Sequence, residues 1–310
     1  MSQYEWIITH EADICYAGGL LITKIWQLIR KTFQQWQKDN VSLIAAALSY
    51  YTVFALAPLL VIVIVVAGTF LGQSSVETQI INEFGDLLGA ETADLITTMI
   101  QSLQNSGNGV IPTLISISLL LFGATNLFFQ LETALNRIWH IEPKTSDGSL
   151  QEVLKFVQKR VLSFGFVLGL GILLIISLVM NSFLSAFVRL ISAEIAWIGL
   201  PLQLVNILVS MTVLTLIFAM IYKYLPDTKI NWQDVWVGAI VTSLLFIMGQ
   251  LAIGAYLGRS TITSTYGAAG SLAALLVWVY YSMQILLIGA EFTQVYTHTF
   301  REYNEIGMTD

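Results

Sequence analysis

The sequence predicts an all-α, polytopic membrane protein with six transmembrane helices, amphipathic interfacial helices and both termini in the cytoplasm. Charged residues make up only 11% of the 310 residues, against roughly 25% in an ordinary soluble domain. The few charges are also placed so that six long windows contain none. Within these windows the apolar runs are continuous, whereas transmembrane β-strands alternate apolar and polar residues. Continuous runs in lipid form helices, because the backbone must satisfy its own hydrogen bonds there.

Each charge-free window is long enough for the roughly 20-residue helix that crosses a hydrocarbon core. We therefore expect one transmembrane helix in each window and exclude a soluble globule. The six windows are Asn40 to Val76, Leu95 to Leu131, Val161 to Val188, Ile195 to Tyr222, Val235 to Gly258 and Ser260 to Ala290.

The basic residues predict the orientation of these helices. When the six windows are threaded in turn, twelve of the 14 Lys and Arg residues fall on one side, and only Arg189 and Arg259 fall on the other. Cytoplasmic loops carry the excess of Lys and Arg, so both termini are expected in the cytoplasm. The net charge of −6 and the lack of a clustered basic face argue against nucleic acid as a partner.

We expect one domain with three parts. Residues 1–39 form a cytoplasmic N-terminal region with an interfacial amphipathic helix, residues 40–298 form the six-helix transmembrane domain, and residues 299–310 form a cytoplasmic tail. The amphipathic helix is predicted by an apolar stripe at helical spacing, with four basic residues beside it. A helix facing solvent and packed on the bundle is the alternative. The stripe consists of Ile22, Ile25, Trp26, Ile29, Phe33 and Trp36.

The first span is expected to begin after Asp39 and Asn40, both good helix caps, and to run about 31 residues to Leu71. At 1.5 Å per residue its length is about 46 Å, which requires tilt, protrusion or a kink at Pro58. A second amphipathic pattern, beginning at Val76, predicts short helices on the external face.

Later boundaries follow from proline and glycine. Pro112 lies where the first turn of a helix tolerates proline, so the second span is expected from about Ile111 to Leu131. The segment from Tyr224 to Asp227 (YLPD) is expected to end the fourth span.

The motifs of common enzymes and cofactor sites are missing, so we expect no enzyme activity, no cofactor and no metal site. The three histidines, His10, His140 and His298, are scattered over different loops, and none lies near a second histidine or a tight carboxylate cluster. The sequence also contains no phosphate-binding loop, so the chain is not expected to be a primary ATPase.

Polar and aromatic side chains on the spans supply candidates for a transport path. A polar stripe on the second span includes Asn126 and Gln130 and continues to Thr133 and Arg137. Because polar groups avoid lipid, this face is expected to point into the bundle, either to line a path or to bond neighbouring helices. The candidate path-lining residues are Tyr50, Tyr51, Asn126, Gln130, Trp278 and Gln284. Packing and helix-to-helix bonding are the alternative roles.

Charged residues are absent from the middle of every span, which disfavours coupling through a carboxylate at the bilayer midplane. The nearest charges, Glu132, Arg137 and Glu291, lie at predicted cytoplasmic helix ends. One hypothesis is that Arg137 pairs with Glu291 or Glu132 and closes the cytoplasmic end. Ordinary interfacial charges are the alternative.

Several blocks of the sequence resemble the YihY/BrkB family of bacterial inner-membrane proteins. They include AAALSYYTVFALAPLL (45–60), LFGATNLFFQLETALNRIWHI (121–141) and YGAAGSLAALLVWVYYSMQILLIGAEF (266–292), with YLPDTKINWQDVWVGA between the last two. The resemblance covers about residues 20–298 and implies a six-helix protein of the bacterial cytoplasmic membrane. Ala55 stands where the family often has serine. Family members have carried the label ribonuclease BN, which conflicts with the lack of a metal cluster and of a basic face here.

Two functions remain as hypotheses. The first is a transporter or lipid-handling permease, with membrane lipids as partners and a small or amphiphilic molecule as substrate. Its cavity would lie among the first, second and sixth spans, with Pro58 as a hinge. The second is a noncatalytic membrane scaffold, or envelope-associated factor, whose cytoplasmic helices recruit partners. Substrate, direction, energy source and oligomeric state do not follow from the sequence.

Overall fold

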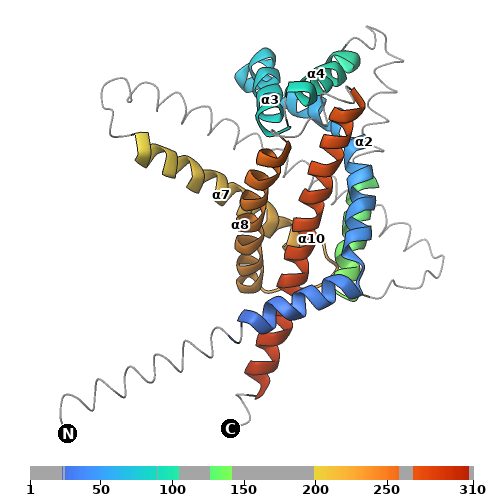
Figure 1. Ribbon diagram of the computed structural model, residues 1–310. Coiled ribbons are helices and arrows are strands. Elements are labelled where there is room, and N and C mark those ends of the chain that lie inside the picture. Colours follow the sequence, from blue (N-terminus) through green and yellow to red (C-terminus); the bar gives the residue numbers. More distant parts are fainter. Residues whose placement is uncertain are drawn as a thin grey trace.

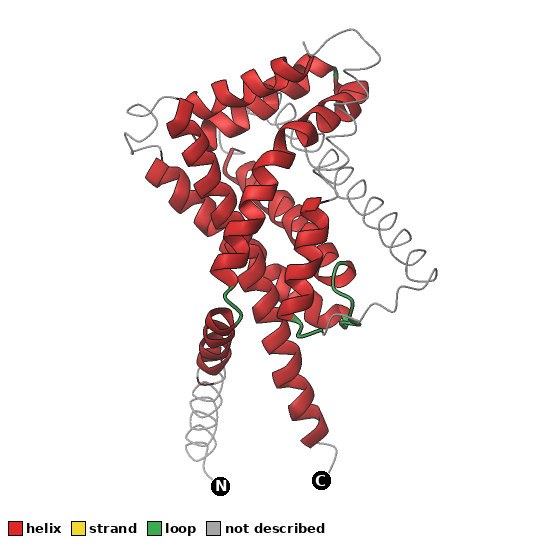
Figure 2. Ribbon diagram, turned by 90° about the vertical axis from the view of Figure 1, so that its right-hand side faces the viewer, coloured by secondary structure: helices red, strands yellow, loops and turns green. Residues whose placement is uncertain are grey.

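The computed structural model describes residues 23, 25–88, 90–104, 126–141, 199–257 and 268–306, and the regular structure in these ranges is entirely helical (Figure 2). The labelled helices are α2 (Val41–Leu71), α3 (Gln73–Leu88), α4 (Ala90–Gln104), α7 (Gly199–Tyr224), α8 (Trp232–Leu257) and α10 (Ala268–Ile306). Two shorter helices, Ile25–Lys38 and 126–138, complete the described part. The prediction of an all-helical protein is therefore confirmed for these residues.

Helix α10 is the centre of the bundle and packs along both α2 and α8, while α7 packs on α8 (Figure 1). In the part of the chain that the structure describes, three helices are long and apolar enough to cross a membrane: Ile207–Tyr224, Trp232–Ile253 and Ala269–Thr299. The bent pair Ile25–Lys38 and Val41–Leu56 raises the number to four if it forms one span. These helices correspond to the predicted first, fourth, fifth and sixth spans. The third predicted span and most of the second lie outside the described residues.

The apolar windows are buried by protein over a third of their residues or less. On α8, large side chains face outward in steps of four, four and three residues, at Ile240, Leu244, Met248 and Leu251. On α2, Leu43, Tyr50 and Phe54 are exposed in the same way. Soluble monomers rarely leave contiguous apolar surfaces of this kind uncovered. Because α8 presents such a stripe over three turns, lipid is the solvent that fits it.

The first span begins and ends where the sequence predicts, at Val41 and Leu71, and Asn40 occupies the expected N-cap position. Asn40 makes no capping hydrogen bond with its side chain. Instead its backbone is left-handed, with φ 54°, a conformation that asparagine tolerates better than most residues. This residue turns the chain between helix Ile25–Lys38 and α2, which meet at 65°.

Helices α3 and α4 cover the end of the bundle opposite helix Ile25–Lys38 (Figure 1). Their buried residues Val76, Ile80, Ile96 and Ile100 join one core with the upper halves of α2 and α10. The two short external helices predicted from the amphipathic pattern are thus present, and their apolar faces rest on the spans. Whether this end faces outward remains a prediction.

Glycine allows α8 and α10 to approach closely. A Cβ atom on Gly289 of α10 would overlap the hydroxyl groups of Tyr222 on α7 and Thr242 on α8. Likewise a Cβ on Gly249 of α8 would overlap the ring of Tyr281. The Tyr222 hydroxyl lies 3.0 Å from Thr242 Oγ1 and donates to the Leu286 carbonyl at 2.7 Å. Small residues and interhelical hydrogen bonds of this kind hold membrane helices together.

The last helix is longer than predicted. The charge-free window of the sixth span ends at Ala290, whereas α10 continues over 39 residues to Ile306. Buried side chains continue past the charge-free window, at Glu291, Thr293, Val295 and Thr297. Packing of this extension against neighbouring elements extends the helix beyond the apolar run on which the prediction relied.

Candidate functional site

Four segments meet at the lower end of the bundle in Figure 1, and we call their meeting point the junction. It comprises the end of helix Ile25–Lys38, the start of α2, the end of helix 126–138 and the middle of α10 around residues 280–291. Each of the two turns here contains a left-handed residue that is not glycine, Asn40 in one and His140 in the other. Within the described residues these are the only two such positions.

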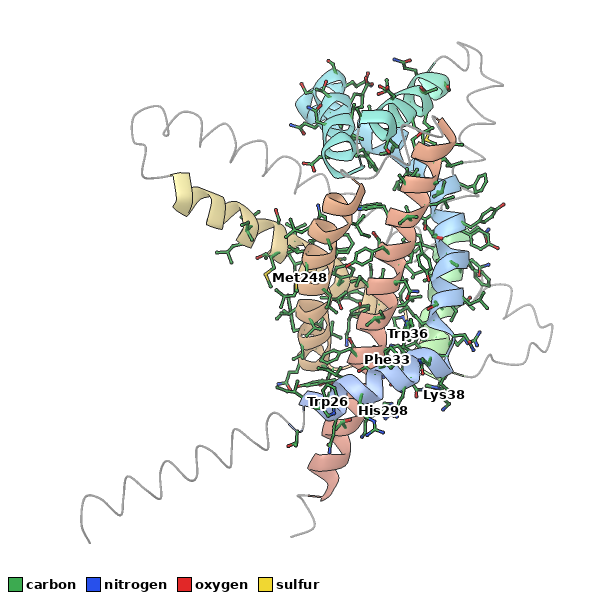
Figure 3. The ribbon with its side chains drawn as sticks, viewed as in Figure 1. Trp26, Phe33, Trp36, Lys38, Met248 and His298 are labelled. Atoms are coloured by element: carbon green, nitrogen blue, oxygen red, sulfur yellow. The ribbon has the colours of Figure 1, made fainter. Side chains whose placement is uncertain are left out.

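Trp36 connects the bent helix to α10. Its indole Nε1 donates to Gln284 Oε1 at 3.2 Å, and Gln284 Nε2 in turn donates to the Tyr280 hydroxyl at 2.7 Å. Figure 3 shows Trp36 directed toward the bundle. Trp26 lies nearer the N-terminal end of the same helix and is 65% exposed. Phe33 stacks on Trp36, with ring centroids 5.2 Å apart. Of this group of aromatic residues, Trp36 alone makes the polar contact with α10.

Asp39 is the polar centre of the bend. Gln35 Nε2 donates to Asp39 Oδ2 at 3.3 Å, and His140 Nε2 lies 3.6 Å from the same oxygen. Gln35 Nε2 and His140 Nε2 are themselves 2.9 Å apart. The imidazole is substantially exposed, while the Asp39 side chain is largely covered. The histidine therefore connects a sheltered carboxylate to solvent.

Glu291 is the most deeply buried ionisable side chain of the junction. It follows Gly289 and Ala290 on α10, is 0% exposed, and neither of its carboxylate oxygens has a hydrogen-bond partner among the described residues. Asp39 is its electrostatic neighbour across the junction. An ionised carboxylate without a partner is costly in an apolar interior.

Two further buried polar atoms near the bend lack partners within the described part of the chain: Thr32 Oγ1 and Trp139 Nε1. Thr32, Trp36 and Asp39 are spaced by four and three residues and so share one helix face. This is the face that meets α10 through Trp36 and Gln284. Unsatisfied buried polar groups are uncommon in native structures and call for an explanation such as a functional role or an absent water.

The neighbouring loop between α7 and α8 is fastened to helix 126–138. Asn136 Nδ2 donates to Asp227 Oδ2 at 3.1 Å, and the Asp227 backbone N–H donates to Asn136 Oδ1 at 2.8 Å. Lys223 donates to the Ile230 carbonyl and lies 5.5 Å from the centre of the Trp232 ring. Aromatic residues Tyr224, Trp232 and Trp236 are exposed around it. Tryptophan and tyrosine gather at membrane interfaces in this way.

The predicted path-lining residues do not form one group. Tyr50 is 57% exposed on α2, beside Phe54, and so does not face the interior of the described bundle. Trp278 contacts Phe84 of α3 at the opposite end from Gln284, with ring centroids 6.2 Å apart. Tyr51, Asn126 and Gln130 are half-buried. Pro58 lies within the continuous helix α2, and its kink remains a prediction.

The expected inward direction of the polar stripe is wrong for the described end of the second span. Thr133 and Arg137 are exposed, and the buried face of helix 126–138 consists instead of Leu131, Ala134, Leu135 and Ile138. In this part of helix 126–138 the polar side chains face outward, because the other face of the helix packs on the apolar core.

The structure does not pair Arg137 with Glu291. Arg137 is exposed, whereas Glu291 is buried and its oxygens are unpartnered within the described residues. Glu132 is half-buried on helix 126–138 and takes part in an interaction of its own. Sequence reasoning also missed Asp39 as the neighbour of Glu291 and Trp36 as the link to α10. Asp39 was interpreted only as a helix cap, and Trp36 only as part of an apolar stripe.

Helical spans, outward apolar surfaces and a polar junction at one end define a polytopic helical membrane protein. The chain matches the family described as virulence factor BrkB over residues 32–310, and it belongs to that family. This confirms the resemblance found in the sequence.

The relatives are named membrane proteins. UPF0761 membrane proteins from Mannheimia succiniciproducens and Pseudoalteromonas atlantica are both 26% identical, and the matches cover 89% and 91% of this chain and 91% and 89% of those proteins. A relative from Ralstonia nicotianae is also 26% identical, with 87% of this chain covered. The chain spans 58% of that relative's length and 62% of the length of one from Verminephrobacter eiseniae. No solved structure matches the chain.

Proposed function

We propose that this protein is a permease of the bacterial cytoplasmic membrane that moves a small uncharged or amphiphilic molecule, and that the junction is its gate. The observation that supports this best is Glu291, a fully buried carboxyl without a hydrogen-bond partner in the described residues. Ionisable residues within membrane segments are expensive, and they mark substrate or ion pathways more often than packing. A scaffold needs no such group, because apolar residues would hold the helices more cheaply.

The geometry of the bend favours a gate. Helix Ile25–Lys38 meets α2 at 65°, and Asn40 forms the turn between them. His140 lies beside this turn, in contact with Asp39. The described side-chain hydrogen bond from this helix to α10 is the one from Trp36 to Gln284. A single hydrogen bond contributes about 0.5–1.5 kcal/mol, so a small change in free energy separates the attached state from a released one. The path itself would run among α2, helix 126–138 and α10, past Tyr51, Asn126, Gln130 and Gln284.

Flux through reconstituted liposomes tests the proposal. We expect vesicles containing the full chain to move fluorescent phospholipid analogues or small uncharged solutes faster than empty vesicles. Trp36→Phe keeps an aromatic ring but removes the donor to Gln284. Losing about 0.5–1.5 kcal/mol of attachment should raise the flux about two- to tenfold.

The matched control is Trp26→Phe, the same change on the same helix at an exposed position, which should leave the flux at the wild-type value. Equal flux in the two variants would show that the junction is not the gate. Flux no faster than in empty vesicles for every probe would instead favour the scaffold.

The alternative, a noncatalytic scaffold, draws support from one observation. The contact of α7, α8 and α10 around Tyr222, Thr242 and Gly289 is tightly packed, and its hydroxyl groups are hydrogen-bonded. Such packing fits a rigid body that presents its interfacial helix to partners. It fits equally well the rigid half of a permease, against which the bend moves.

A further inference from the structure

Glu291 is two residues from both Gly289 and Thr293, so it lies on the opposite face of α10 from the hydroxyl groups that pack there. On α10 itself, the Thr293 hydroxyl donates to the Gly289 carbonyl. From α7, the Tyr222 hydroxyl donates to the Leu286 carbonyl, and from α8, Thr242 Oγ1 donates to the Gly238 carbonyl. These donors are already committed to backbone oxygens. From the bend, Val41 packs in one core with Leu287 and Ala290, and the neighbouring carboxyl from that segment is Asp39.

Basic side chains in the described part of the chain lie elsewhere. Lys38 and Arg137 are exposed, and Lys223 is held by the Ile230 carbonyl and the Trp232 ring. Among the basic groups that the structure describes, His140 is the one in contact with Asp39. It lies on the Asp39 side, where its Nε2 is 3.6 Å from Asp39 Oδ2. An ionised Glu291 would therefore have no basic partner among the described residues.

We propose that Glu291 and Asp39 form a proton-binding site, in which one proton is held on the buried pair and holds the bent helix against α10. In this state the protonated Glu291 carboxyl faces the Asp39 carboxylate, and His140 connects that carboxylate to solvent. Two like charges sharing a site cannot both ionise freely, and one proton removes the conflict. The described residues contain no cluster of three metal-ligating side chains, so a proton fits the site better than a metal ion.

Release of the proton has a mechanical consequence. It leaves two negative charges facing each other in an apolar setting, where repulsion is much stronger than in water. The repulsion is relieved when Asp39 moves away from α10, and Asn40 is the turn about which helix Ile25–Lys38 can rotate. Trp36 is on the moving helix, so its hydrogen bond to Gln284 breaks at the same time. The proton thereby controls the gate of the proposed permease, and the inference rests on that function only for this last step.

Infrared titration of the full chain in lipid nanodiscs tests the site without measuring any flux. We expect a protonated-carboxyl band at neutral pH that disappears as the pH rises and is absent from Glu291→Gln. In Asp39→Asn the midpoint of its disappearance should move to lower pH, because the neighbouring negative charge has been removed. The control Glu132→Gln changes a half-buried carboxyl at the same end and should keep the wild-type titration.

A second measurement follows the helix. Spin labels at Gln34 and His298, both exposed, can be placed on cysteines after the chain's single cysteine, Cys15, is replaced by serine. We expect the distance between the labels to change between low and high pH in the wild type and to remain at its low-pH value in Glu291→Gln, because glutamine imitates the protonated acid.

A band that persists in Glu291→Gln would overturn the proposal. So would a distance that responds to sodium at constant pH rather than to pH itself. Because neither measurement involves transport, the site can be confirmed even if the liposomes show no flux, and it can fail while flux is present.

Discussion

Gly289→Leu should prevent α7, α8 and α10 from packing together. Even a Cβ at this position would overlap the hydroxyl groups of Tyr222 and Thr242, and both groups are buried and hydrogen-bonded. Neither can withdraw without leaving a buried polar group unpaired, which costs about 1–3 kcal/mol by itself. With the overpacking added, we expect a loss of about 3 kcal/mol or more. The measurement is the midpoint of thermal unfolding in detergent, together with the fraction of protein that elutes as a single species.

Ala273→Leu is the matched control for this prediction. It introduces the same side chain on the same helix at an exposed position, so its unfolding midpoint should stay near that of the wild type. A Gly289→Leu protein as stable as the Ala273→Leu protein would show that α10 does not approach α7 and α8 as closely as the structure has it.

Met248→Arg should prevent stable insertion of the chain into membranes. Met248 is 67% exposed on the outward face of α8 (Figure 3). An exposed position in water tolerates such a change within about 0.5 kcal/mol. At the centre of a helix in lipid, arginine costs about 2.5–3.5 kcal/mol. The amount of protein in the carbonate-resistant membrane fraction measures the effect, and we expect a severalfold decrease.

Gln34→Arg serves as its control, because it places the same charge at an exposed position on the polar bend helix. We expect its yield in the membrane fraction to match that of the wild type. Equal yields of the two arginine variants would mean that water, rather than lipid, covers the outer face of α8.

The sequence predicted the spans better than their connections. The predicted cap at Asn40 and the apolar run to Leu71 gave the bounds of α2 correctly, and the proline at 226 marked the end of α7 at Tyr224. Hydrophobicity determines where a helix meets lipid, and the sequence alone shows where the hydrophobic residues are. The extension of α10 to Ile306 was not predicted, because it depends on tertiary packing of polar residues. The positive φ of Asn40 was missed for a similar reason, since a cap and a left-handed turn favour the same residue.

The junction was predicted only in part. Glu291 and Gln284 were candidates from their place at the end of the last span, but their neighbours Asp39 and Trp36 lie about 250 residues earlier in the chain. Pairing across that distance leaves no local pattern in the sequence. The structure also gives a physical role to residues in the blocks that carry the resemblance: Asn136 fastens the YLPD loop through Asp227, and Gly289 makes room for Tyr222.

The threading of the chain through the membrane decides every role proposed above, and labelling of single cysteines measures it directly. In a Cys15→Ser background, cysteines replace Ser75 on α3 and Lys38 at the bend, both exposed, and spheroplasts are treated with a maleimide that cannot cross membranes. We predict that position 75 reacts in intact spheroplasts and that position 38 reacts only after lysis. Reaction at position 38 in intact spheroplasts, with position 75 protected until lysis, would contradict the orientation and place the proposed gate on the opposite side of the membrane.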